Sequence, residues 1–216
     1  MRRNGLDPRL LLSLLALVVI AGGVALLTVG GSSAQQANRV QAKQANLDAE
    51  GLLTPVAPAP ALALDNYLGQ PVNIDSYRGK AVLVTFLYTN CPDICPLITS
   101  NLRVAQNLMG PKVSSKVQII AVSVDPRGDT PKAVAAFLAR HEMTGRMQYL
   151  IGSAAQLARV WKAWGVGSER DAQQPQFINH SGLIYGITAS GKRLAVYAAS
   201  FQPAEIAHDV PLLAAR

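Results

Sequence analysis

The residues of this chain whose types and spacing best suit chemistry are its two cysteines, Cys91 and Cys95. Each precedes a proline, and the pair directly follows the strongly strand-like apolar run 81–88. Because proline disfavours the helical conformation for the residue before it, we expect a regular helix to begin near Pro96, with Cys95 close to its N-cap. The helix dipole favours a thiolate at that position, which predicts a thiol pKa below the free value of about 8.5.

Two thiolates a few ångströms apart can form a disulfide or bind a soft metal ion. A purely structural disulfide between Cys91 and Cys95 is the plainest alternative. It would close a very short loop, so its entropic stabilisation falls below the roughly 3 kcal/mol expected for a 15-residue loop. Two thiolates alone satisfy Cu(I), and a nitrogen atom as the third ligand would make the site suit Cu(II) as well. Zinc normally requires four donors. Redox or metal chemistry is therefore the favoured interpretation.

The three histidines are the candidate nitrogen ligands. His141 comes at the end of an expected solvated helix, and His208 lies beside Asp209 in an expected terminal helix, so surface or capping roles are favoured for both. His180 lies in segment 177–182, an expected loop from which a side chain could reach back over the end of a sheet. From the residues alone, a loop histidine is more often an ordinary residue than a ligand, and both interpretations of His180 stay open.

The N-terminus has the pattern of a membrane anchor. Three arginines within residues 1–9 precede an uncharged apolar run, and we expect a transmembrane helix over residues 10–30. Twenty helical residues rise about 30 Å, enough to cross the hydrocarbon core. The positive-inside rule predicts a cytoplasmic segment 1–9 in the inner membrane and a domain on the periplasmic or outer face. The alternative is a signal peptide cleaved near residues 32–34, although its apolar region is usually shorter, about 7 to 15 residues.

The rest of the chain divides into a linker and one domain. Residues 31–60 are rich in Ser, Gln and Ala and then in Pro, which predicts a linker, whereas residues 61–216 have the length and pattern of a single domain. The net charge of +7 is scattered without a basic stripe, so nucleic-acid binding is not expected. Alternating strand and helix patterns predict a three-layer α/β domain with a mixed sheet. The main expected elements are strands at 81–88, 116–124, 147–151, 183–188 and 193–197, and helices at 96–109, 131–141, 154–164 and 203–215.

Several motifs together resemble those of the Sco/SenC family. They are Tyr-Thr-Asn-Cys-Pro-Asp-Ile-Cys-Pro at 88–96, Val-Asp-Pro at 124–126, Asp-Thr-Pro at 129–131 and His-Ser at 180–181. The resemblance covers about residues 62–213, and the combination is highly specific. It implies a membrane-anchored copper protein with a thioredoxin-like fold, in which a mixed central sheet is flanked by helices. Members of this family help to assemble the binuclear copper centre of cytochrome c oxidase subunit II.

The resemblance also implies the site residues. Carried over position by position, the copper ligands are Cys91, Cys95 and His180. Asp125 and Asp129 are interpreted as supporting residues, Asp125 bracing the cysteine loop and Asp129 supporting the turn into the next helix. The chain departs from the family at two positions: Asn179 replaces an acidic residue before the histidine, and Gly128 replaces an arginine before the Asp-Thr-Pro motif.

Two functions from different classes follow. The favoured one is a copper chaperone, loaded with Cu(I) or Cu(II), that passes the metal to subunit II or to a related oxidase assembly factor. The alternative is an enzyme, a thiol-disulfide reductase that keeps the target's ligand cysteines reduced; it needs Cys91 and Cys95 but not His180. A peroxiredoxin-like peroxidase, suggested by the strand-cysteine-helix layout, is a distant third.

Overall fold

The computed structural model of the chain describes residues 46–170, 172–174 and 177–216. The predicted cytoplasmic segment 1–9 and transmembrane helix 10–30 lie outside the described residues. Within the described ranges, no helix is both long and apolar enough to span a bilayer.

The fold is centred on strand β4 (Ala81–Leu87), in which all seven residues are buried. This strand pairs in parallel with β5 (Val117–Ser123), which pairs in parallel with β6 (Met147–Ile151). Continuous apolar runs of this kind are typical of strands that are covered on both faces. Antiparallel strands complete an eight-stranded sheet in the order β1-β10-β9-β4-β5-β6-β2-β3. They are β1 (Gly51–Pro58), β2 (Ala63–Asn66), β3 (Pro71–Asn73), β9 (Ile184–Ile187) and β10 (Lys192–Tyr197), and a short 3-10 helix η1 (Ile74–Tyr77) follows β3.

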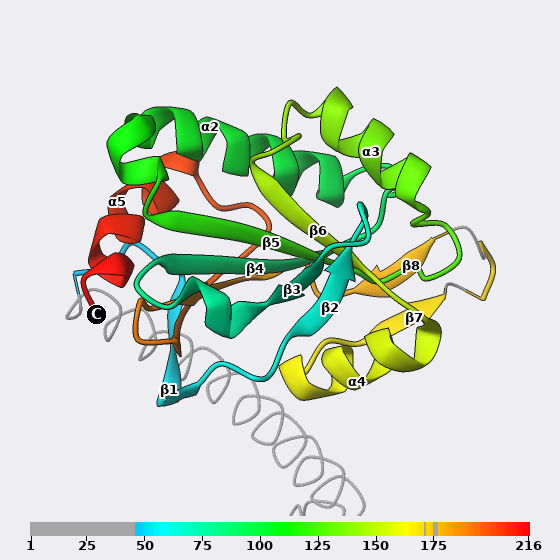
Figure 1. Cartoon of the computed structure of the whole chain (residues 1–216), viewed down its shortest axis with the longest axis horizontal. Coiled ribbons are helices and arrows are strands. Elements are labelled where there is room, and N and C mark those ends of the chain that lie inside the picture. The colour runs from blue at the N-terminus through cyan, green and yellow to red at the C-terminus, as the bar shows by residue number, and fades with distance from the viewer. Residues whose placement is uncertain (1–45, 171, 175–176) are drawn as a thin grey trace, which may run out of the picture.

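Helices cover both faces of the sheet (Figure 1). On one face lie α2 (Ile94–Ser114), α3 (Pro131–Arg140) and α5 (Pro203–Ala214), and on the other lies α4 (Ala154–Trp164). The mixed α/β sheet flanked by helices confirms the predicted architecture.

Helices α3 and α4 lie close to their predicted ranges and have capping residues at their ends. The Thr130 side chain accepts a hydrogen bond from the Ala133 amide at the start of α3. Ser153 forms a capping box with Gln156 at the start of α4, and Gly165 ends that helix with a φ of 68°. Each of these ends is therefore set by local sequence.

Strand β1 corrects the predicted extent of the linker. Residues 51–58 pair antiparallel with β10, from Gly51 opposite Val196 to Pro58 opposite Lys192. Prolines are tolerated in a strand at the edge of a sheet, so a proline-rich composition did not exclude this pairing. The partner strand lies about 140 residues later, where a local pattern cannot reveal it. Part of the predicted linker therefore belongs to the domain.

Helix α2 begins earlier than predicted. It starts at Ile94 with Asp93 at the N-cap, so Cys95 lies in its first turn and not at its cap. Pro96 is accommodated because the first amides of a helix have no intrahelical partner. Gly110, where the helix was predicted to end, has φ 65° and ψ 173° and kinks the chain before a last turn that reaches Ser114.

Candidate metal centre

Cys91 and Cys95 lie side by side where β4 passes into α2. Cys91 belongs to the connecting loop and is 8% exposed, whereas Cys95 is fully buried. The Cys95 amide donates a hydrogen bond of 3.3 Å to Cys91 Sγ, and the Cys91 amide donates one of 3.3 Å to the Tyr88 carbonyl oxygen. Both thiols are free, with no disulfide between them. The sulfur of Cys91 thus faces the positive end of the helix.

The two thiols have opposite acidities. Hydrogen bonding from the Cys95 thiol is the main cause that lowers the pKa of Cys91, to about 5, and backbone amides of Asp93 and Cys95 add to it against the effect of burial. The same hydrogen bond, together with burial, raises the pKa of Cys95. The sequence predicted a lowered pKa for the thiol near the helix N-cap, Cys95, but in the structure the pKa of Cys95 is raised and that of Cys91 is lowered. In the reduced protein Cys91 is the thiolate and Cys95 is its proton donor.

His180 approaches the pair from a second small sheet. It ends strand β8 (Ile178–His180), which pairs with β7 (Ser168–Arg170), so the predicted loop is a short strand. Its Nε2 atom lies 3.8 Å from Cys95 Sγ, and Nδ1 lies 3.3 Å from the carbonyl oxygen of Ser181. Burial lowers the pKa of His180, which keeps the imidazole neutral and able to bind a metal.

The spacing of these atoms suits one metal ion. Thiolate and imidazole bind a first-row metal such as zinc at about 2.3 and 2.0 Å, which at a trigonal angle separates them by about 3.7 Å. The observed distance between Cys95 Sγ and His180 Nε2 is 3.8 Å. The donor atoms of Cys91, Cys95 and His180 do not all lie within 4.8 Å of one another. Among the described residues, the group of potential ligands that meets this distance is a different one. The structure brings Cys91, Cys95 and His180 together, and their role as copper ligands stays a prediction.

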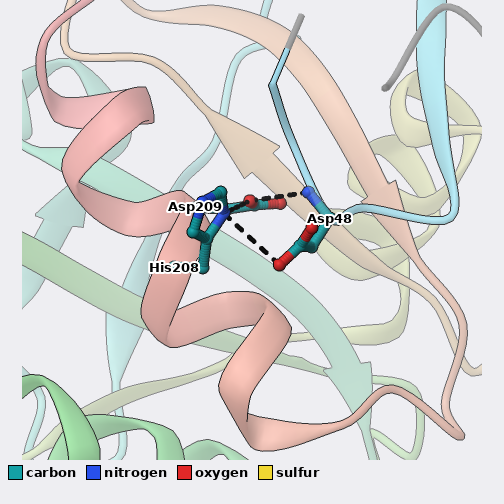
Figure 2. Close-up of side chains that lie close together, drawn as sticks. All are labelled: Asp48, His208 and Asp209. Carbon is teal, nitrogen blue, oxygen red and sulfur yellow. Dashed lines mark hydrogen bonds and ion pairs between the residues drawn. The ribbon is translucent and has the colours of Figure 1, made fainter. Parts of the chain in front are cut away.

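That different group consists of Asp48, His208 and Asp209, and it anchors the start of the domain (Figure 2). The buried Asp209 carboxylate accepts hydrogen bonds from the amides of Asp48 and Ala49, from the Tyr197 hydroxyl and from His208 Nδ1, at 2.8 to 2.9 Å. Four donors fill the acceptor capacity of a carboxylate. His208 also lies 3.4 Å from Asp48 Oδ2. The group therefore ties the chain before β1 to helix α5, which was not predicted from sequence.

The two supporting aspartates lie in the turn between β5 and α3, where the Asp129 amide donates a hydrogen bond to the Asp125 carbonyl oxygen. Asp129 braces the cysteine loop, because its buried carboxylate accepts hydrogen bonds from the Thr89 amide at 2.8 Å, from Ser123 Oγ at 2.6 Å and from the Tyr149 hydroxyl at 2.9 Å. Asp125 supports the turn: its carboxylate accepts a hydrogen bond of 3.2 Å from the Arg127 amide, and its carbonyl oxygen accepts one of 2.9 Å from the Asp129 amide.

A family model described as SCO1/SenC matches residues 59–215. The chain belongs to the SCO1/SenC family. A structure of the ScoI protein of Bradyrhizobium japonicum, with copper bound, superposes with a TM-score of 0.64 at 28% sequence identity, covering 73% of this chain and 99% of that one. The thioredoxin-like fold expected from the motifs is thereby confirmed.

Two mitochondrial proteins are also similar in sequence to this chain. The SCO2 homolog of Mus musculus is 30% identical over 152 residues, covering 68% of this chain and 59% of that protein. The SCO2 homolog of Bos taurus is 34% identical over 119 residues, covering 53% of this chain and 44% of that protein. The chain thus spans about half the length of the curated relatives that it matches.

One departure from the SCO1/SenC pattern has a structural reason. A Cβ atom placed on Gly128 would lie 2.4 Å from Asp125 Oδ2. A side chain at this position therefore requires the Asp125 carboxylate to move. The other departure, Asn179, is an exposed residue of β8, and nothing in the structure explains it.

Proposed function

We propose that this protein is a membrane-anchored copper chaperone that delivers copper to the binuclear centre of cytochrome c oxidase subunit II. The observation that carries the proposal is the approach of the His180 imidazole to within 3.8 Å of the buried sulfur of Cys95, beside the Cys91 thiolate. Family membership adds copper as the expected cargo, since a family relative of known structure has copper bound.

The arrangement suits a metal that must be released. Two sulfurs and one imidazole leave a coordination position open, so an incoming thiolate or imidazole from the target can bind before a ligand of the chaperone leaves. Cys91 lies in the loop and is the more exposed of the two cysteines, 8% against 0% for Cys95. We therefore place the exchange with the target at Cys91, while Cys95 and His180 hold the ion.

The partner and the cellular location belong to the same proposal. An anchor at residues 10–30 would hold the domain at the periplasmic or outer face of the inner membrane, close to subunit II or to a related assembly factor. We expect the full chain to co-purify with subunit II that lacks copper. The complex should be lost after copper transfer. Copper loading of the oxidase that is unaffected by deletion of this protein would contradict the proposal.

A copper titration of the reduced full chain in detergent, with competition by a calibrated chelator, tests the proposed site. We expect one equivalent of tightly bound copper. In His180→Ala, Cu(II) binding should be much weaker and its thiolate-to-metal charge-transfer band reduced, whereas Cu(I) binding should persist on two sulfurs. His141→Gln is the matched control, because His141 follows α3 and contacts Ser100 and Phe137 instead of the cysteines. An unchanged Cu(II) spectrum in His180→Ala would contradict the site.

A thiol-disulfide reductase is a second candidate, favoured by the lowered pKa of Cys91 beside a buried thiol of raised pKa. The Cys91 thiolate would attack a target disulfide and form a mixed disulfide, releasing one target thiolate. Cys95, after losing its proton, would then attack Cys91 and release the second. Two electrons pass to the target, and Cys91 and Cys95 end as a disulfide. Reduction of an oxidised subunit II peptide by His180→Ala at the wild-type rate would support this activity.

A further inference from the structure

Tyr88, the first residue after β4, contacts each of the three predicted ligand segments. It is 3% exposed, although it lies at the edge of the site. Its carbonyl oxygen accepts the hydrogen bond from the Cys91 amide, and its ring packs edge-on against the His180 imidazole with the centroids 5.7 Å apart at 79°. Its own amide lies close enough to the Cys95 thiol to oppose the rise of that thiol's pKa. Tyr88 therefore links both cysteines to the histidine.

The hydroxyl of Tyr88 connects two parts of the chain that are far apart in sequence. It accepts a hydrogen bond of 3.3 Å from the Ile178 amide, 90 residues away, at the start of β8. The same hydroxyl lies close enough to the Cys91 thiol to contribute to its lowered pKa. The oxygen thus lies between the cysteine loop and the strand that ends at His180.

His180 ends a small two-stranded sheet. Strand β8 has three residues, and its paired strand β7 also has three, so this small sheet is separate from the eight-stranded one. Short two-stranded sheets are marginally stable by themselves. The Tyr88 hydroxyl fixes the first residue of β8, and the Tyr88 ring contacts the imidazole at its last residue. Together these contacts restrict both the path of the strand and the plane of the ligand ring.

The geometry points to Tyr88 as the positioning residue of the copper site, which holds the His180 imidazole over the two sulfurs. This inference rests on the proposed copper-binding function and adds a residue that binds no metal itself. Residues that orient the ligands of a metal site typically change metal affinity by 10- to 100-fold when they are replaced. Because Cu(I) is satisfied by the two sulfurs, the effect should fall on Cu(II), which needs the nitrogen ligand.

Tyr88→Phe tests the hydroxyl and keeps the ring. We expect Cu(II) affinity of the full chain, measured by chelator competition, to fall about tenfold, while Cu(I) affinity changes by less than about threefold. In a His180→Ala background, Tyr88→Phe should change Cu(II) affinity by less than about twofold, because a positioning residue acts only through the ligand that it positions. Tyr185→Phe is the matched control: it removes a buried hydroxyl that donates to the Trp164 carbonyl oxygen, away from the cysteines.

A metal-free measurement separates this inference from the proposed function. Amide hydrogen exchange at Ile178 should accelerate in Tyr88→Phe and stay at the wild-type rate in Tyr185→Phe. Equal Cu(II) affinities of Tyr88→Phe and wild type, an equal loss of Cu(I) and Cu(II) affinity, or an undiminished effect in the His180→Ala background would each overturn the positioning role. Absence of copper binding by the wild type would instead overturn the proposed function and this inference with it.

Discussion

At the scale of single residues, the decisive property of the site is the difference between its two thiols. Cys91 and Cys95 are chemically identical and four positions apart, yet one is a thiolate near neutral pH and the other is a buried proton donor. The difference arises because only Cys91 accepts hydrogen bonds from both the partner thiol and the helix amides. A soft metal displaces the single remaining proton when it binds, so binding of copper and loss of that proton are coupled.

Selective alkylation tests this assignment in the reduced, metal-free protein. Iodoacetamide reacts with thiolates, so Cys91 should be labelled first, with a half-maximal rate near the pH of about 5 at which it ionises. Cys95→Ala removes the main hydrogen-bond donor and should move that midpoint to higher pH. Mass spectrometry of digests taken across a pH series measures both. Preferential labelling of Cys95 would contradict the assignment.

At the scale of elements, the loop between β4 and α2 is held by a network that reaches across the sheet. Asp129, at the turn before α3, joins Thr89 of the loop to Ser123 on β5 and to Tyr149 on β6. Burial raises the pKa of Asp129, while these hydrogen bonds oppose the shift. The carboxylate is therefore a connector between two strands and the cysteine loop, not a ligand.

Replacement of Asp129 tests the connector. Asp129→Ala leaves two buried hydroxyls and one partly buried amide without their acceptor, so we expect the free energy of unfolding in urea to fall by about 3 kcal/mol. Asp129→Asn keeps one carbonyl oxygen and the shape of the side chain, and the Ser123 and Tyr149 hydroxyls can rotate to accept from its amide. The loss of stability should therefore be smaller. Copper affinity should follow the same order. A destabilisation by Asp129→Ala below that of Asp129→Asn would show that the network does not hold the loop.

At the scale of the whole molecule, Asp209 holds the segment before β1, just as Asp129 holds the cysteine loop. Leu47 and Ala49 are buried, and strand β1 then runs along the edge of the sheet. The hydrogen bond to Asp209 is the main cause that raises the pKa of His208, and the charge of Asp48 adds to it against the opposing effect of burial. The protonated imidazole is thus favoured when this segment is attached to helix α5.

The anchor should make stability depend on pH. A raised histidine pKa in the folded protein contributes stability that is complete below the unfolded value of about 6.5 and is lost as pH rises through the folded value. The melting temperature of His208→Gln should therefore lie below that of wild type at pH 5.5, and the difference should shrink by pH 8.5. His141→Gln provides the contrast, because burial lowers the pKa of His141 and gives the opposite trend. A constant difference for His208→Gln would exclude the mechanism.

The sequence by itself determined the elements whose signals are local. The apolar run of β4 and the helices α3 and α4, which follow the capping residues Thr130 and Ser153, depend on neighbours within a few positions. Each lies where it was predicted. The same is true of strands β9 and β10. The motif combination was also specific enough to identify the family.

The tertiary structure decided every feature whose partners are distant in the chain. Three contacts join partners that lie from about 40 to about 140 residues apart. They are the pairing of β1 with β10, the hydrogen bond from Thr89 to Asp129 and the contact of Tyr88 with β8. A hydrogen bond between residues far apart in the chain produces no local pattern in the sequence. Its donor and acceptor are common groups that only the fold brings together. Which sulfur is the thiolate, and whether an imidazole reaches the pair, therefore follow from packing that only the folded chain supplies.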